Sequence, residues 1–289
     1  MIIVKLSGGL GNQMFQYCMG LNLAEKLDTE FCLDTSYLLD RSEKKKIVFR
    51  DYDLPIFQLS NHRFRGTVSK SNLFLEKHFN KLLPTNLKSY IVEETFLYQP
   101  KLNHLARKDI YLDGVWQSPK YFETIKQDVF KAFSFSEDFD DNVRVFKSKI
   151  DSVLSICLNV RRADFVNNDF HGTMEVDYYA KAIEELSSRV NNNKDFHIFI
   201  FSDDLVWCKE NLHFDYPTTF VEHDLKGRKF SSYLYLMQQC KYFIIPNSSF
   251  AWWAAWLCAY EKKVVIAPKV WFKSGLDAKD LIPESWVRL

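Results

Sequence analysis

The sequence lacks an excess of charge of either sign. Its 289 residues include 38 Lys and Arg against 37 Asp and Glu, which gives a formal net charge of +1. A protein whose main role is to bind nucleic acid usually carries a basic excess or a basic face, whereas the two signs are well mixed along this chain. We therefore expect no nucleic-acid partner.

Closely paired cysteines are also missing. Most of the six cysteines lie in apolar stretches, where a free thiol behaves as a small hydrophobe. None has the spacing of a zinc site or a redox dithiol. This pattern is typical of a reducing compartment. The cysteines are Cys18, Cys32, Cys157, Cys208, Cys240 and Cys258.

No long apolar run or leader segment is visible. Met1 leads directly into a strand-like segment at residues 2–6, so we expect no signal peptide. The longest uncharged run, residues 242–260, is interrupted by Pro246 and three polar residues, and the remainder is too short to span a bilayer. We expect a cytoplasmic protein, with peripheral association at the inner membrane left open.

The second half of the chain alternates apolar strands with helical patterns. This alternation predicts βαβ units and a parallel sheet covered on both faces, which is a Rossmann-like domain. Strands are predicted at residues 153–160, 196–201, 218–221, 242–245 and 264–267, and helices at 176–190, 205–212, 230–240 and 250–260.

The first half is less regular, and residues 50–107 show no clear pattern. A polar helix at residues 138–150 is interpreted as a linker between two domains. The elements predicted before it are strands at 2–6, 30–34 and 109–112 and helices at 13–27 and 119–133.

Polar or glycine-rich residues follow four of the predicted strands. They occupy residues 7–13, 159–164, 202–204 and 247–249. Ligands of parallel α/β sheets bind beyond the carboxyl ends of the strands, so four such groups together predict a binding cleft.

The first group is a glycine turn between a strand and a helix. Gly9 and Gly11 let the backbone approach a ligand, and Asn12 and Gln13 add amide groups suited to sugar hydroxyls. Met14 stands where a dinucleotide fingerprint has its third glycine, which disfavours a nicotinamide-dependent oxidoreductase.

Two adjacent arginines follow the strand at 153–160. Arg161 and Arg162 are costly at the end of a buried strand unless something anionic meets them, and a guanidinium matches phosphate oxygens in bidentate fashion. Asp164 could hold one arginine while the other faces the ligand. The alternative is a purely structural ion-pair cluster.

Two aspartates end the next strand. Asp203 and Asp204 could accept hydrogen bonds from a guanine ring or a ribose hydroxyl. Either could equally cap the helix that begins near residue 205.

The fourth group precedes a helix that is apolar nearly all round. Asn247, Ser248, Ser249 and Phe250 mark the amino end of this helix, where free amides, the helix dipole and hydroxyl groups suit a diphosphate. Ordinary capping by Ser248 or Ser249 is a compatible alternative.

Two Asp-x-Asp sequences raise the question of a metal ion. They lie at residues 51–53 and 138–140, the second within a charged, linker-like stretch. Arg50 adjoins the first, and no second acidic cluster lies near it in the sequence. We expect no metal site and no cofactor.

Taken with these motifs, the chain resembles the bacterial α-1,2-fucosyltransferases. These belong to glycosyltransferase family eleven, which also contains the animal blood-group H enzymes. The similarity covers essentially the whole chain, and it is carried by residues 3–17, 50–54, 114–122, 201–204, 247–257 and 282–287.

The resemblance implies an α/β, GT-B-like fold of two Rossmann-like domains that face a donor cleft. Residues 1–145 would form the acceptor side and residues 150–289 would bind GDP-fucose. It also implies a metal-independent, inverting transfer of L-fucose to the 2-hydroxyl of a terminal β-galactose. The acceptor would be an oligosaccharide or a lipid-linked glycan, in the synthesis of a surface glycan such as O-antigen.

The resemblance also assigns roles within the arginine motif. Arg161 is implied to bind the donor β-phosphate, while Asn159 stands where the family usually has histidine and cannot carry a proton. The candidate catalytic residues are Arg161, Asp164, Asp169 and His171. Of these, Asp164, Asp169 or His171 could be the base, and departure of GDP through an oxocarbenium-like state with little base assistance is also open. The residues expected to bind the donor are Gly9, Gly11, Asn12, Gln13, Asn159, Arg161, Asp203, Asp204, Asn247, Ser248, Ser249 and Phe250.

Two alternative functions remain open on the sequence. One is fucosyl transfer with another linkage, such as α-1,6, since such an enzyme would share the arginine and serine motifs. The other is a catalytically silent homologue that binds a GDP-sugar or a glycan, for which Asn159 is the main argument.

Overall fold

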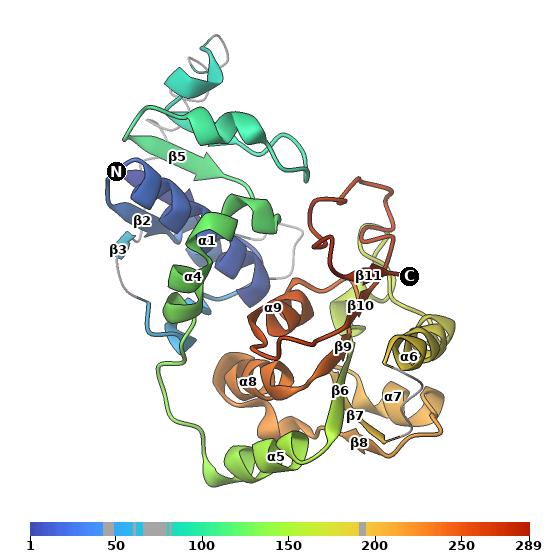
Figure 1. Ribbon diagram of the computed structural model, residues 1–289. Coiled ribbons are helices and arrows are strands. Elements are labelled where there is room, and N and C mark those ends of the chain that lie inside the picture. Colours follow the sequence, from blue (N-terminus) through green and yellow to red (C-terminus); the bar gives the residue numbers. More distant parts are fainter. Residues whose placement is uncertain (43–48, 60–61, 66–79, 81–82, 191–194) are drawn as a thin grey trace. The chain divides into compact units, whose positions relative to one another are not determined.

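The described residues divide by their contacts into two units, each built on a parallel sheet. The computed structural model describes residues 1–42, 49–59, 62–65, 80, 83–190 and 195–289 (Figure 1). Residues 1–136 and 279–281 form the first unit, and residues 137–278 and 282–289 form the second.

The second unit contains a six-stranded sheet in the order β11-β10-β9-β6-β7-β8. Every neighbouring pair in this sheet is parallel. The five strands predicted for this half are confirmed within one or two residues, and the short β11 is an addition. The strands are β6 (Leu154–Val160), β7 (Phe196–Ser202), β8 (Thr218–Phe220), β9 (Tyr242–Ile244), β10 (Val265–Ala267) and β11 (Val287–Arg288).

Helices cover both faces of this sheet. In Figure 1, α6 and α7 lie on one side of the sheet, while α5, α8 and α9 lie on the other. The apolar face of α6 packs Tyr179, Ile183 and Leu186 against the strands, which are buried nearly throughout. The helices are α5 (Asp141–Asp151), α6 (Val176–Arg189), α7 (Leu205–Asn211), α8 (Ser231–Gln239) and α9 (Ser249–Leu257).

The strand order places one topological switch point in this unit. From β6 the chain builds outward to β7 and β8, then returns to the other side of β6 and builds β9, β10 and β11. This is the order of the doubly wound dinucleotide-binding sheets, in which the ligand lies where the order reverses. The carboxyl ends of β6 and β9 are therefore the place to look for a site.

Helix α5 differs from the linker that we expected at residues 138–150. Its buried Val143 and Ile150 face the second unit, the Phe146 ring meets the Phe199 ring at 5.7 Å, and Phe139 stacks on Tyr235 at 4.0 Å. Residues 137–145, which we had placed in the first domain, thus belong to the second unit by their contacts. The apolar face of α5 explains the difference.

The first unit contains a five-stranded sheet in the order β3-β2-β1-β5-β4, with all pairs parallel. Here β3, β4 and the 3₁₀ segments were not predicted. The strands are β1 (Ile2–Lys5), β2 (Phe31–Asp34), β3 (His62–Arg65), β4 (Tyr90–Val92) and β5 (Ile110–Asp113), and the α-helices are α1 (Leu10–Lys26), α2 (Ser36–Leu39) and α4 (Lys126–Ala132).

One predicted helix of this unit is broken. We expected a continuous helix over residues 119–133, but two short 3₁₀ segments, Pro119–Tyr121 and Glu123–Ile125, precede α4. Phe122 separates them with φ −138° and ψ 16°, which lies outside the helical range. Its side chain is fully buried, so packing of this ring accounts for the break.

Two further features bear on the expectations from composition. The six cysteines are buried free thiols. Among the helices in the described part of the chain, none combines the length and apolarity needed to cross a membrane.

Candidate active site

Arg161 leaves the carboxyl end of β6 between two carboxylates. Its Nη2 lies 2.5 Å from Asp164 Oδ1, and its Nη1 lies 2.7 Å from Asp203 Oδ2 at the end of β7. A guanidinium has five N–H donors, so these pairs use only part of its capacity and fix the plane of the group. The side chain is about a quarter exposed, at the switch-point edge of the sheet.

Arg162 has different surroundings from its neighbour. Its guanidinium carbon lies 3.9 Å from the centre of the Trp207 ring, and its Nε lies 3.4 Å from Asp204 Oδ2. Its backbone N–H donates to Asp203 Oδ1 at 2.9 Å. Arg162 is therefore packed onto helix α7, and Asp203 contacts both arginines.

The remaining predicted residues of β6 and β7 make bonds within the sheet and its helix. Asn159 is buried, and its Nδ2 donates to the Phe201 carbonyl at 3.0 Å. Asp204 caps α7 by accepting from the Trp207 backbone N–H at 3.1 Å. The capping alternative thus describes Asp204, while Asp203 is bonded to the arginines.

The carboxyl end of β9 leads straight into the amino end of α9. Ser248 is the N-cap residue, and its hydroxyl accepts from the Ala251 N–H at 3.5 Å. Ser249 and Phe250 are half-buried in the first turn. The backbone N–H groups of this turn and the helix dipole create a positive potential at the switch point.

Asn247 ties this helix end to the loop that follows β6. Its Nδ2 donates to the carbonyl oxygens of His171 at 2.9 Å, Gly172 at 3.3 Å and Trp271 at 3.1 Å. The structure therefore brings residues 159–172 and 247–250 together at one edge of the second sheet.

Within this loop, the His171 side chain is half-buried and the Asp169 side chain is exposed. The His171 ring is half-buried and stacks on the Phe165 ring at 4.4 Å between centres. Its Nδ1 is buried and has no hydrogen-bond partner among the described residues. The Asp169 side chain is fully exposed and pairs with Lys273 at 3.2 Å.

The surroundings of His171 keep its imidazole neutral. Burial lowers the pKa of this side chain below its usual 6.5, and the charge of Arg161 lowers it further, although Asp164 acts in the opposite direction. A neutral imidazole near neutral pH can accept a proton, which is what a general base must do.

The glycine turn of the first unit lies at the switch point of that sheet, between β1 and β5. Gly8 has φ +74°, a conformation that favours glycine, and a Cβ at Gly9 would meet no atom within 4 Å. Gln13 is fully buried, with Nε2 donating to the Gly8 carbonyl at 2.9 Å and the Asp51 carbonyl at 2.8 Å. Gly11 is buried inside α1, and Asn12 accepts from Gln117 at 2.8 Å.

Gln16 is a buried residue of this region that sequence reasoning did not single out. Its Oε1 accepts from the Ser7 N–H at 3.0 Å, and its Nε2 donates to the Gly114 carbonyl at 2.9 Å, so it joins the ends of β1 and β5. The sequence feature that could have identified Gln16 is its position three residues after Gln13, which places both glutamines on the same face of a largely apolar helix.

Glu93, just after β4, was also missed. Its two carboxylate oxygens accept from the N–H groups of Val115 at 2.7 Å and Trp116 at 3.0 Å. Burial raises the pKa of this carboxyl to about 7, and the two backbone bonds oppose the shift. Because β4 is three residues long and was not predicted, no sequence signal marked Glu93 as a strand-end residue.

The Asp-x-Asp segments have structural partners. Asp51 pairs with Arg41, and Asp140 caps α5 by accepting from the Val143 N–H at 2.9 Å. Within the described ranges, no group of three or more His, Cys, Asp or Glu side chains could hold a metal ion.

Comparison with known proteins first defines the class. The structure of an Arabidopsis thaliana FUT1 mutant in complex with GDP has a similar fold, with a TM-score of 0.52 at 9% identity over 91% of this chain and 69% of that one. The fold is GT-B-like, an architecture of glycosyltransferases. The model of glycosyl transferase family 11 matches residues 1–289, and the chain belongs to this family.

Similar proteins with assigned names are also glycosyltransferases. The Escherichia coli O-antigen biosynthesis glycosyltransferase WbnK is 31% identical over 98% of this chain and 99% of its own. An Escherichia coli alpha-1,2-colitosyltransferase is 30% identical over the whole chain and 98% of its own. A Caenorhabditis elegans galactoside 2-alpha-L-fucosyltransferase is 23% identical over the whole chain and 79% of its own. The resemblance inferred from the motifs is thus confirmed.

Proposed function

We propose that this glycosyltransferase moves L-fucose from GDP-fucose to the 2-hydroxyl of a terminal β-galactoside, with inversion and without a metal ion. The observation that carries the proposal is Arg161 at the switch point of the second sheet, beside the amino end of α9. Both groups suit a diphosphate, and family 11 contains relatives named for α-1,2 transfer.

In this proposal the second unit binds the donor. Arg161 contacts the β-phosphate while Asp164 and Asp203 hold its guanidinium in place, and the first turn of α9 supplies backbone N–H groups. As the bond between fucose and the β-phosphate breaks, negative charge collects on GDP. Donors fixed in advance stabilise this charge without reorganisation, which is usually the largest electrostatic contribution to catalysis.

We take His171 as the general base. The acceptor hydroxyl attacks the anomeric carbon of fucose on the face opposite GDP, and its proton passes to the neutral imidazole. His171 is favoured over Asp169 because its ring is half-buried against Phe165, whereas Asp169 is fully exposed and paired with Lys273.

The proposal is tested by incubating the protein with GDP-fucose and a panel of β-galactosides, with the product linkage determined by NMR. An α-1,2-fucosylated product is the expected result. An α-1,6-fucosylated product would show that the proposed α-1,2 linkage is wrong. If no GDP is released either with or without acceptor, the protein is a catalytically silent homologue.

A second donor is supported by one specific relative. The Escherichia coli protein that is 30% identical over nearly its whole length is named an alpha-1,2-colitosyltransferase. Parallel reactions with GDP-fucose and GDP-colitose at equal concentration compare kcat/KM for the two sugars. A higher kcat/KM for GDP-colitose would identify it as the preferred donor. The roles proposed for Arg161 and His171 would stay the same.

A further inference from the structure

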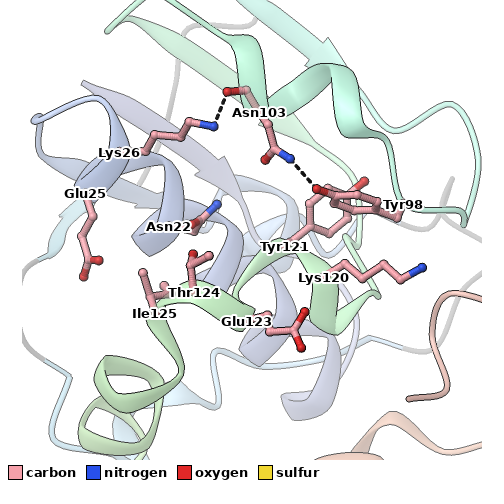
Figure 2. Close-up of a pocket in the computed structure, with 10 residues that line it drawn as sticks. All are labelled: Asn22, Glu25, Lys26, Tyr98, Asn103, Lys120, Tyr121, Glu123, Thr124 and Ile125. Atoms are coloured by element: carbon pink, nitrogen blue, oxygen red, sulfur yellow. Dashed lines mark hydrogen bonds between the residues drawn. The ribbon is translucent and has the colours of Figure 1, made fainter. Parts of the chain in front are cut away.

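A cavity of about 790 Å³ opens in the first unit, far along α1 from the glycine turn. Helix α1 begins at Leu10, beside that turn, and ends at Lys26, about 24 Å away along the helix axis. The volume lies within the range of sites that bind small molecules. As Figure 2 shows, the cavity is lined by Asn22, Glu25, Lys26, Tyr98, Asn103, Lys120, Tyr121, Glu123, Thr124 and Ile125.

The floor of the cavity carries the largely buried side chain of Asn22. Asn22 is only 8% exposed, yet its side chain makes no hydrogen bond to any described residue. In Figure 2 its amide group is directed into the space between α1 and Tyr121. Neither amide atom of Asn22 is among the fully buried polar atoms that lack a partner, so the amide is open to the cavity, where it can both donate to and accept from a ligand.

Two tyrosines form the wall opposite Asn22. The Tyr98 and Tyr121 rings lie 5.0 Å apart, and Tyr121 is nearly fully buried. The Tyr121 oxygen accepts from the Gln99 N–H at 3.0 Å, and the Tyr98 oxygen accepts from the Asn103 amide. Within the described residues neither O–H group donates, so both remain available to a ligand.

The rim of the cavity is charged but balanced. Lys26 and Lys120 are exposed on it, and so are Glu25 and Glu123. Lys120 is paired with Asp280 at 2.7 Å, which reduces the positive charge further. A nucleotide or another polyanion would need a cationic site, whereas a neutral ligand with many hydroxyls suits alternating donors and acceptors.

We propose that this cavity is a second carbohydrate site, which binds a segment of a neutral oligosaccharide. Asn22 bonds to sugar hydroxyls from the floor, the tyrosine wall contacts the sugar ring, and the charged groups of the rim bond to the outer hydroxyls. The site is separate from the donor site of the second unit and does not depend on the transfer reaction.

The test observes binding directly through Ile125, whose side chain lines the floor. Protein with ¹³C-labelled isoleucine methyl groups is titrated with the neutral tetrasaccharide lacto-N-neotetraose, alone and with saturating GDP. The Ile125 signal is assigned with Ile125→Val. We expect a saturable shift of this signal with the tetrasaccharide in both series and no shift with GDP alone.

Two variants test the cavity itself. Asn22→Leu keeps the size of the side chain and removes the amide, and Thr124→Trp fills the mouth from an exposed position. Each should weaken tetrasaccharide binding at least tenfold, while Asn211→Leu, a matched change on α7 in the second unit, should not. Because these titrations contain no donor sugar, they are independent of fucosyl transfer.

Three results would overturn the proposal. The first is an Ile125 signal that does not respond to the tetrasaccharide. The second is an Ile125 signal that responds to GDP or to the acidic sugar trigalacturonate in preference to the neutral one. The third is unchanged affinity in folded Thr124→Trp protein, which decides the matter even if Asn22→Leu does not fold.

Discussion

At the scale of single residues, the two arginines after β6 have separate surroundings. Arg161 is held at the sheet edge by Asp164 and Asp203, and part of its guanidinium is exposed. Arg162 packs on Trp207 and lies near Asp204. We therefore expect Arg161 to act on the donor and Arg162 to contribute to folding.

This difference leads to a kinetic prediction. Replacing Arg161 by Ala should lower kcat by about 10²- to 10³-fold, because the lost donor stabilises charge that develops only in the transition state. Arg161→Lys should remain impaired, since lysine keeps the charge but loses the planar fork. Steady-state kinetics and melting temperatures are measured together, with Arg162→Ala as the matched control. A folded Arg161→Ala protein with near-normal kcat would disprove the assignment.

A second prediction concerns His171. Because burial lowers its pKa below 6.5, a base at this position is active above that pKa, and kcat/KM should fall as the pH drops through it. His171→Gln should lower kcat by about 10²- to 10⁴-fold and remove this acid limb. Asp169→Asn should have little effect. If the large loss appears in Asp164→Asn and His171→Gln is nearly normal, the base is Asp164 instead.

At the scale of elements, helix α9 combines a polar amino end with a buried apolar body. Ala251, Trp252, Trp253, Ala254 and Ala255 are fully buried, so the sheet and the neighbouring helices fix the direction of the helix. Its amino end is held in turn by the Ser248 cap and by Asn247. An end so fixed can present N–H groups to a phosphate without moving.

Replacing Ser248 and replacing Ser249 should therefore have different effects, the first on stability and the second on GDP binding. Ser248→Ala removes the cap and should cost about 1 kcal/mol of stability. Ser249→Leu places an apolar group in the first turn and should weaken GDP binding about tenfold, as expected for the loss of one hydrogen bond to a charged group. Calorimetric titration with GDP measures the second effect. Unchanged GDP affinity in Ser249→Leu would limit these serines to capping.

Glu93, just after β4, provides a test of stability against pH. Burial raises the pKa of Glu93 from 4.5 to about 7, so folding favours the protonated form. This stabilisation is complete below pH 4.5 and is lost as the pH rises towards 7. Glu93→Gln should therefore flatten the decline of the melting temperature over this range.

The neighbouring Glu94 supplies the control for Glu93. Its pKa is lowered, first by the hydrogen bond from exposed Lys101, so its contribution to stability is present above 4.5 and is lost as the pH falls. Glu94→Gln should leave the decline between pH 4.5 and 7 in place. An equal flattening in both variants would show that Glu93 is not the group responsible.

At the scale of the whole molecule, we expect transfer to need no metal ion, because protein groups are proposed to meet the charge of the diphosphate. Arg161 and the amino end of α9 supply positive charge in the proposal, and the same protein should therefore turn over at an unchanged rate in excess EDTA. The measurement is GDP release with and without the chelator. Activity that disappears in EDTA and returns with manganese or magnesium would direct attention to Asp51 and Asp53.

Much of the second unit could be predicted from the sequence because its strands are buried on both faces. Such strands read as continuous apolar runs, and the helices between them keep a helical period of apolar residues. The residues at the strand ends followed directly, so the arginine motif, the two aspartates and the serine motif were located before any pairing was known.

The first unit shows where this approach fails. Strand β4 is three residues long and lies in the stretch at 50–107, where the sequence shows no clear apolar pattern. The helix expected over 119–133 is interrupted at Phe122, because the packing of that ring depends on residues distant in the sequence. Local propensity carries no information about such contacts.

The sequence by itself determined the βαβ pattern, the strand ends and the family, since these depend on local periodicity and on short motifs. Only the tertiary structure decided the strand order, and with it the switch point between β6 and β9. The tertiary structure alone shows that Asn247 bonds to the loop of His171 and that the Asn22 amide, which bonds to none of the described residues, faces a cavity. The reason is physical: hydrogen-bond partners and burial are set by pairing between distant segments, which no local pattern encodes.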